Sequence, residues 1–214
     1  MWISLFFIVL FVFCMSYIIR QHKRLKLAIH LSRNAHFPIT EDEYDAIRTV
    51  PDWKGMEPLT EEAKGYRQVR LLTFLAIIFM SSIVTIIIFT DRFDAAFLNI
   101  AYMFIPIMSL IKHNGSFFLL QKGIVFQGFF YPWRSIEYYK VEKIIKWHDL
   151  YGYHDKVNNG YKLSIKVKGK FTKPAYIVIS NREVLDKILK DFSKHGLLES
   201  EENKEKTTKK VTEQ

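Results

Sequence analysis

Residues 71–89 read LLTFLAIIFMSSIVTIIIF and contain no charged side chain. A helix of this length, at 1.5 Å per residue, crosses a hydrocarbon core about 30 Å thick. Arg67 and Arg70 stand directly before the run and mark one end of it. The sequence therefore predicts a transmembrane helix over residues 71–89.

Two further uncharged runs lie on either side. Residues 2–19, WISLFFIVLFVFCMSYII, are followed rather than preceded by basic residues, which favours an uncleaved anchor over a signal peptide. We take residues 1–19 as the first transmembrane helix. Residues 95–111 form a shorter run with a proline at position 106, which neighbouring helices can tolerate. They are predicted to be a third span, with a buried or interfacial hairpin partner as the alternative.

The basic residues near these runs predict the orientation. Loop 20–70 has basic clusters at both of its ends, whereas loop 90–94 has one arginine. Basic loops face the cytoplasm, so we expect a multi-pass protein of the cell membrane with its N-terminus outside and its C-terminal part cytoplasmic. The juxtamembrane cluster after the first run attracts anionic headgroups or serves as a topology signal alone. It comprises Arg20, Lys23, Arg24 and Lys26.

Loop 20–70 is predicted to contain short helices. Thr40 and Glu43 have the spacing of a capping box, which predicts a helix over residues 41–48 that ends before Pro51. The single cysteine, Cys14, excludes an intramolecular disulfide and a cysteine-based metal site.

After residue 114 the apolar runs become short. Strands are expected over residues 116–120, 124–131, 134–147, 161–168 and 175–180, with an Asn-Gly hairpin signal within residues 154–160. In YKLSIKVK at 161–168, apolar and polar residues alternate strictly. An amphipathic helix follows, with Asn181 as its N-cap and Gly196 at its end. We predict an α+β domain over residues 114–198 and a disordered tail over residues 199–214.

Strands that end in one helix, together with QKGIVFQGFFYPWRSI at 121–136, resemble the bacterial pleckstrin-homology-like domains attached to short membrane hairpins. The resemblance implies an antiparallel sheet or barrel capped by a C-terminal helix. The expected fold class is thus a three-helix transmembrane region followed by this α+β domain. The resemblance implies a scaffold role more than a reaction. It also permits an alternative, a bacteriocin or toxin immunity protein that acts in the membrane.

No catalytic site is expected. The chain has no phosphate-binding glycine loop and no nucleophile elbow. His148, Asp149, His154 and Asp155 are metal-ligand types, but their spacing fits no helical pair, and we read them as a hairpin tip. We therefore predict a chain that is not an enzyme and has no metal and no cofactor.

The net charge of +9 lies mostly after residue 111, where 20 Lys and Arg face 12 Asp and Glu. Anionic membrane lipid is the expected partner rather than nucleic acid, because the membrane is already present. A lysine stripe on the strand at 161–168 and just beyond it is the predicted surface for lipid or for an unknown protein partner; strand-edge protection is the alternative. The stripe comprises Lys162, Lys166, Lys168, Lys170 and Lys173.

Overall fold

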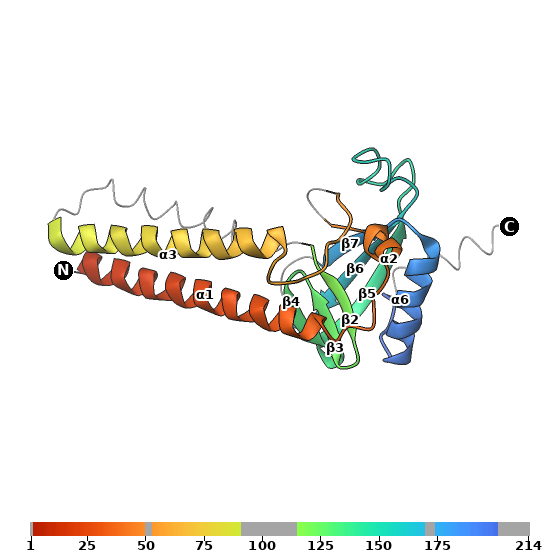
Figure 1. Cartoon of the computed structure of the whole chain (residues 1–214), viewed down its shortest axis with the longest axis horizontal. Helices are drawn as coiled ribbons and strands as arrows, with labels where there is room; N and C mark the ends of the chain where they lie inside the picture. Colours follow the sequence, from red (N-terminus) through yellow and green to blue (C-terminus); the bar gives the residue numbers. More distant parts are fainter. Residues whose placement is uncertain (1, 50–52, 91–114, 170–173, 201–214) are drawn as a thin grey trace. The chain divides into compact units, whose positions relative to one another are not determined.

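The computed structural model describes residues 2–49, 53–90, 115–169 and 174–200. The chain divides into two compact units. A helical unit contains residues 1–29 and 59–113, and an α+β unit contains residues 30–58 and 114–214. Figure 1 shows the elements of each unit along the chain.

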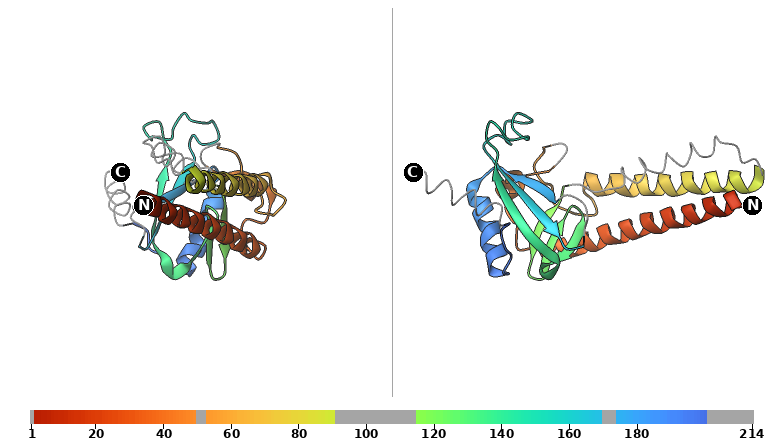
Figure 2. Two further views of the ribbon diagram at one scale, coloured as in Figure 1. Left: turned by 90° about the vertical axis from the view of Figure 1, so that its left-hand side faces the viewer. Right: turned by 180° about the vertical axis from the view of Figure 1, so that it is seen from behind.

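The helical unit is built on α1 (Trp2–Ser32) and α3 (Lys64–Thr90), which run antiparallel and side by side (Figures 1 and 2). The ring of His22 on α1 stacks on the ring of Tyr66 on α3, with centroids 6.2 Å apart. The buried residues of α3 recur at alternating steps of three and four, which is the spacing of a helix–helix seam. They are Tyr66, Val69, Thr73, Ala76, Met80 and Ile83.

Among the residues that the structure describes, one helix is long and apolar enough to cross a membrane, over Lys64–Ile83. The predicted span at 71–89 falls within α3. The predicted first span lies in α1, whose described residues do not meet the same criterion. The predicted third span, residues 95–111, lies outside the described residues. The three-helix transmembrane region is therefore not confirmed.

The α+β unit has two antiparallel sheets and a C-terminal helix, as predicted. The described strands form no closed barrel, so a pleckstrin-homology-like barrel is not confirmed. One sheet has the order β2-β3-β4, and the other has the order β1-β7-β6-β5. The strands are β1 (Ile47–Arg48), β2 (Phe117–Leu120), β3 (Gly123–Phe126), β4 (Phe129–Pro132), β5 (Ile136–Lys143), β6 (Tyr161–Val167) and β7 (Ala175–Ile179). The short helices α2 (Glu41–Ala46) and η1 (Trp133–Ser135) and the closing helix α6 (Arg182–Lys194) complete the unit.

The prediction of one strand over residues 124–131 is wrong, because the chain reverses at Gln127 and Gly128. Both residues have positive φ, 51° and 76°, as a two-residue hairpin turn with right-handed strand twist requires. Ser116 holds this turn: its carbonyl accepts from the Gln127 N–H at 2.8 Å, and its hydroxyl accepts from the Gly128 N–H at 2.7 Å. The segment is therefore a hairpin of β3 and β4.

The segment before the second helix is part of the α+β unit. β1 pairs with β7, with Ile47 opposite Ile179. Nearer the start of this segment, the backbone of residues 36 and 37 exchanges hydrogen bonds with Leu119 of β2. The predicted capping box of Thr40 and Glu43 is confirmed at the start of α2. Residues 30–58 of the predicted loop 20–70 thus complete the sheet whose other strands come from the C-terminal region.

Helix α6 is attached to both sheets through Phe192, which is fully buried. Its ring lies 6.0 Å from that of Trp133, which follows β4, and 5.1 Å from that of Tyr139 on β5. The predicted N-cap is confirmed, since the Asn181 side chain accepts from the Glu183 N–H. Gly196, with φ of 70°, follows the helix end as expected.

The chain continues along the free edge of β5. The Tyr139 N–H donates to the Leu198 carbonyl at 3.1 Å, and the Ser200 N–H donates to the Tyr139 carbonyl at 2.9 Å. Residues 199 and 200, at the start of the predicted disordered tail, are therefore paired with β5. Residues 201–214 lie outside the described part of the chain.

Candidate functional site

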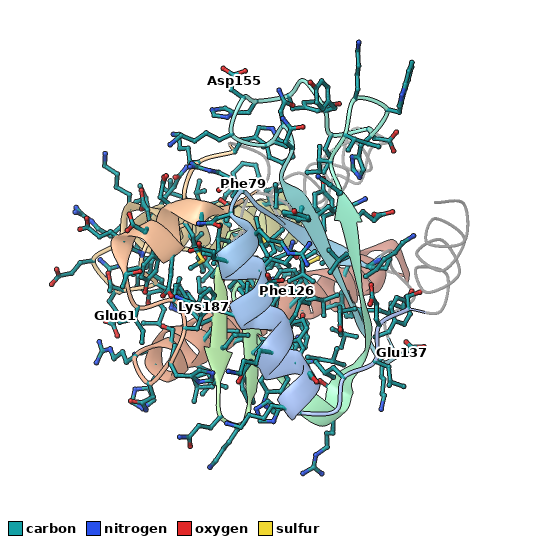
Figure 3. The ribbon with its side chains drawn as sticks, turned by 90° about the vertical axis from the view of Figure 1, so that its right-hand side faces the viewer. Glu61, Phe79, Phe126, Glu137, Asp155 and Lys187 are labelled. Carbon is teal, nitrogen blue, oxygen red and sulfur yellow. The ribbon has the colours of Figure 1, made fainter. Side chains whose placement is uncertain are left out.

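The connection between β5 and β6 is a long loop, residues 144–160, which we call the projecting loop (Figures 1 and 3). Its ends are joined by two hydrogen bonds, from the Ile144 N–H to the Gly160 carbonyl at 2.8 Å and from the Asn159 N–H to the Ile144 carbonyl at 3.0 Å. The Asn-Gly pair therefore closes the base of a long loop and is not the tight hairpin turn predicted. Loops of this length without secondary structure are uncommon, and they are usually either functional or linker segments.

The base of the projecting loop has its own small core. Ile144 and Val157 are fully buried against Val178 of β7. Leu150, from within the loop, packs against this cluster, as do Trp53 and Tyr176. The apolar cluster fixes the base of the loop to the sheet.

Side chains within the projecting loop also hold its turns. The Nδ1 atoms of His148 and His154 accept hydrogen bonds from the Leu150 and Lys156 N–H groups, at 3.0 and 3.1 Å. The Asn158 side chain accepts from the Gly152 N–H at 2.8 Å. In the described residues, no group of three or more His, Cys, Asp or Glu could hold a metal ion. The two histidines therefore act as turn acceptors.

The outer surface of the projecting loop is aromatic. Trp147 is 89% exposed and Tyr153 is 66% exposed, and Ile145 and Tyr151 also face solvent. Two lysines, 146 and 156, balance two aspartates, 149 and 155, and all four are exposed. Figure 3 shows Asp155 at the far end of the loop. Tryptophan and tyrosine in such positions are typical of residues that dominate protein–protein interfaces.

Ion pairs join the projecting loop to the N-terminal segment of the unit. Lys156 Nζ lies 3.2 Å from Asp45 Oδ2, and Arg48 lies 2.9 Å from the same carboxylate oxygen. Burial raises the pKa of Asp45, but hydrogen bonds and positive charge from Lys156 and Arg48 outweigh it and lower that pKa. The carboxylate thus stays ionised and links the loop to β1.

One lysine of the predicted stripe, Lys162, is paired with a carboxylate on the neighbouring strand. Glu142 of β5 pairs with Lys162 at 3.1 Å and with Lys140 at 3.3 Å. Burial raises the pKa of Glu142, but these two lysines lower it overall. Lys166 also has an interaction partner, and Lys168 is exposed. Lys170 and Lys173 lie outside the described residues. Lys162 of the stripe is therefore ion-paired, and the stripe as a binding surface stays a prediction.

The predicted juxtamembrane cluster is partly gathered. Arg20, Lys23 and Arg24 line an open groove of about 450 Å³ on α1, and Lys26 is exposed but does not line it. The remaining lining residues are Ser16, Ile19 and Leu27. We call this feature, with its six lining residues, the basic groove.

Sequence reasoning missed the projecting loop as a surface. The available signal was the concentration of Trp147, Tyr151 and Tyr153 between two strands. Comparisons of the chain with protein-family models, with curated proteins and with solved structures find no match. The function is therefore argued from the geometry of this chain.

Proposed function

We propose that the chain is a non-enzymatic, membrane-anchored binding protein whose α+β unit docks a protein partner through the projecting loop. The observation that carries the proposal is Trp147, which is 89% exposed on a loop closed by hydrogen bonds. A large aromatic side chain costs free energy when it is left in water. A loop fixed at its base presents it with little further loss of conformational entropy on binding.

Two features favour a protein over anionic lipid as the ligand of this unit. The lysines and aspartates of the projecting loop balance, so the loop has no net attraction to a negatively charged surface. In addition, the Glu142 carboxylate already pairs with Lys162 of the lysine stripe. Aromatic side chains with hydrogen-bonding edges remain as the main binding groups of the loop.

The helical unit supports membrane anchoring. Large apolar side chains point outward from both helices, away from the seam between them. A helix that is apolar on all sides suits a membrane better than water. The exposed ones include Val12 and Phe13 of α1 and Leu71, Phe74, Leu75 and Phe79 of α3.

The connectivity of the α+β unit supports paired crossings. Because β1 and β7 pair within the α+β unit, we assign the described residues of that unit to one side of the membrane. If α3 leaves that side, the chain must return before residue 115. We therefore propose spans at 1–19, 71–89 and 95–111, with the N-terminus outside and a cytoplasmic pleckstrin-homology-like domain.

The docking proposal is tested with a photo-crosslinking amino acid at position 147, in the full chain in native membranes. The matched control carries it at position 168, an exposed site just after β6. We expect one discrete protein adduct from position 147, which is lost when Tyr151 and Tyr153 are replaced by alanine, and none from position 168. Adducts to lipid alone, equal adducts at both positions, or none at position 147 would each reject the proposal.

A further inference from the structure

Basic side chains occur on the two long helices, α1 and α3, without acidic ones. Neither α1 nor α3 contains an Asp or a Glu, so these cations have no counter-charge on their own helices. An acidic partner for any of these cations must come from outside the two helices. The cations, which we call the basic collar, are Arg20, Lys23, Arg24 and Lys26 of α1 and Lys64, Arg67 and Arg70 of α3.

The collar ends at about the same height on both helices. The stacked rings of His22 and Tyr66 place these two residues level with each other. Arg20 lies two residues from His22 and Arg70 four residues from Tyr66, and in antiparallel helices these displacements point the same way. They correspond to about 3 Å and about 6 Å along the axis. Beyond them the exposed side chains are uncharged and mostly apolar, beginning with Ile19 and Leu71.

The basic groove crosses this boundary. Ser16 and Ile19 lie on its uncharged side, and Arg20, Lys23 and Arg24 lie on its basic side. The spacing of its residues places them on one face of α1. Within the described part of the chain, neither Arg20 nor Lys23 takes part in an ion pair. Its volume of about 450 Å³ is large enough for a small ligand group.

We propose that the basic groove binds the phosphate of an anionic phospholipid headgroup, with the lipid chains along Ile19 and the apolar face beyond it. Guanidinium and ammonium groups suit phosphate, and the arginine fork binds two of its oxygens at once. The apolar side chain of Ile19 can contact the hydrocarbon chains of a lipid but gains nothing from free phosphate, which favours a lipid as the ligand. This inference rests on the membrane anchoring proposed above and adds a ligand class and a site.

The test uses the full chain in zwitterionic detergent with phosphatidylglycerol or phosphatidylcholine added, and native mass spectrometry to measure retained lipid. The variant R20Q/K23Q removes two groove cations. The matched control K26Q/R70Q removes two collar cations that do not line the groove. We expect R20Q/K23Q to lose about 30-fold of its phosphatidylglycerol affinity, roughly fivefold for each cation. The control variant K26Q/R70Q and the charge-preserving variant R20K/K23R should each keep most of their affinity for phosphatidylglycerol.

Three results would overturn the inference. These are equal losses in R20Q/K23Q and K26Q/R70Q, no preference for phosphatidylglycerol in the unaltered chain, and displacement of the lipid by millimolar inorganic phosphate. Carbonate extraction of native membranes separates the inference from its premise. If the chain stays in the membrane but shows no lipid preference, only the lipid site is wrong. If carbonate releases the chain, the proposed membrane anchoring is wrong as well.

Discussion

Lys187 of α6 donates a hydrogen bond of 2.9 Å from Nζ to Oε1 of Glu43, a side chain 144 residues earlier in the chain. The other carboxylate oxygen accepts from the Ile39 N–H at 2.8 Å and from the Thr40 N–H at 3.3 Å. Glu43 is only 8% exposed. In Figure 3 Lys187 lies on the side of α6 nearest α2. One carboxylate therefore caps α2 and joins it to the closing helix.

We expect Glu43→Gln to lower the free energy of unfolding of the α+β unit by about 1–2 kcal/mol at pH 7, the size of a lost cap. Burial raises the pKa of Glu43, but hydrogen bonds from Ile39, Lys187 and Thr40 outweigh it and lower that pKa below the usual value for a glutamate. The carboxylate stabilises the fold fully above its unfolded pKa, and this contribution is lost as the pH falls through the folded pKa. Denaturant unfolding of the full chain in detergent should therefore show that the unfolding free energies of the unaltered chain and of Glu43→Gln become equal at acidic pH.

The matched control for that variant is Glu41→Gln. Glu41 lies in the first turn of the same helix and is exposed. The Glu41→Gln substitution should change the free energy of unfolding by less than about 0.5 kcal/mol. If Glu43→Gln behaved like Glu41→Gln at every pH, the linking role of Glu43 would be wrong.

Gly123→Ala should be among the most damaging single changes in the unit. A Cβ at this position would collide with the backbone of β4, meeting the Tyr131 carbonyl and lying 2.7 Å from the Pro132 Cα. Since backbone in a paired strand cannot move aside, we expect a loss of about 3 kcal/mol or more in unfolding free energy. Chemical denaturation followed by fluorescence measures it.

Gly152→Ala provides the comparison, because a Cβ there meets nothing within 4 Å. Its φ of +88° makes the alanine strained, so a cost of about 1 kcal/mol is expected. Equal costs at positions 123 and 152 would contradict the steric argument.

Glu142→Gln should expose the positive charge of the sheet face. The variant leaves Lys140 and Lys162 without their shared carboxylate, and we expect a loss of about 0.5–1 kcal/mol at low salt. The loss should shrink in 1 M salt because screening weakens the remaining repulsion. Glu137→Gln, an exposed change on the same strand, is the control. A loss that does not depend on salt would count against the charge argument.

Asp45→Asn should loosen the projecting loop without unfolding the unit. Removing the charge weakens the contacts with Lys156 and Arg48. We expect about fivefold faster hydrogen exchange in residues 154–158, measured by mass spectrometry on the full chain. Asp155→Asn keeps the same chemistry elsewhere in the loop and should leave exchange nearly unchanged. If the two variants exchange alike, the anchoring role of Asp45 is refuted.

The features that the sequence predicted correctly depend on neighbouring residues. The capping box at Thr40, the N-cap at Asn181 and the glycine after the last helix all act within one turn of a helix. The strict alternation of residues 161–168 likewise placed β6 within one residue of its observed end. Such signals require no knowledge of the rest of the chain.

The features that were missed depend on distant residues or on a competing local choice. The pairing of Ile47 with Ile179 has no local signal, because two residues are too short to show a strand period. The reversal at Gln127 was hidden by apolar residues on both sides of it, and the Ser116 side chain that satisfies the turn lies just before β2, outside the hairpin. Lys162 looked free because its partner, Glu142, lies on the adjacent strand.

The pairing of β1 with β7 also sets the order of events during synthesis. A ribosome that adds about 5–20 residues per second needs several seconds to pass from Arg48 to Ile179. Throughout that interval β1 lacks the strand that it pairs with in the finished fold. The α+β unit can therefore complete its four-stranded sheet only after β7 has been synthesised, so a chain that stops before β7 would leave β1 unpaired and be recognisable to quality-control proteases.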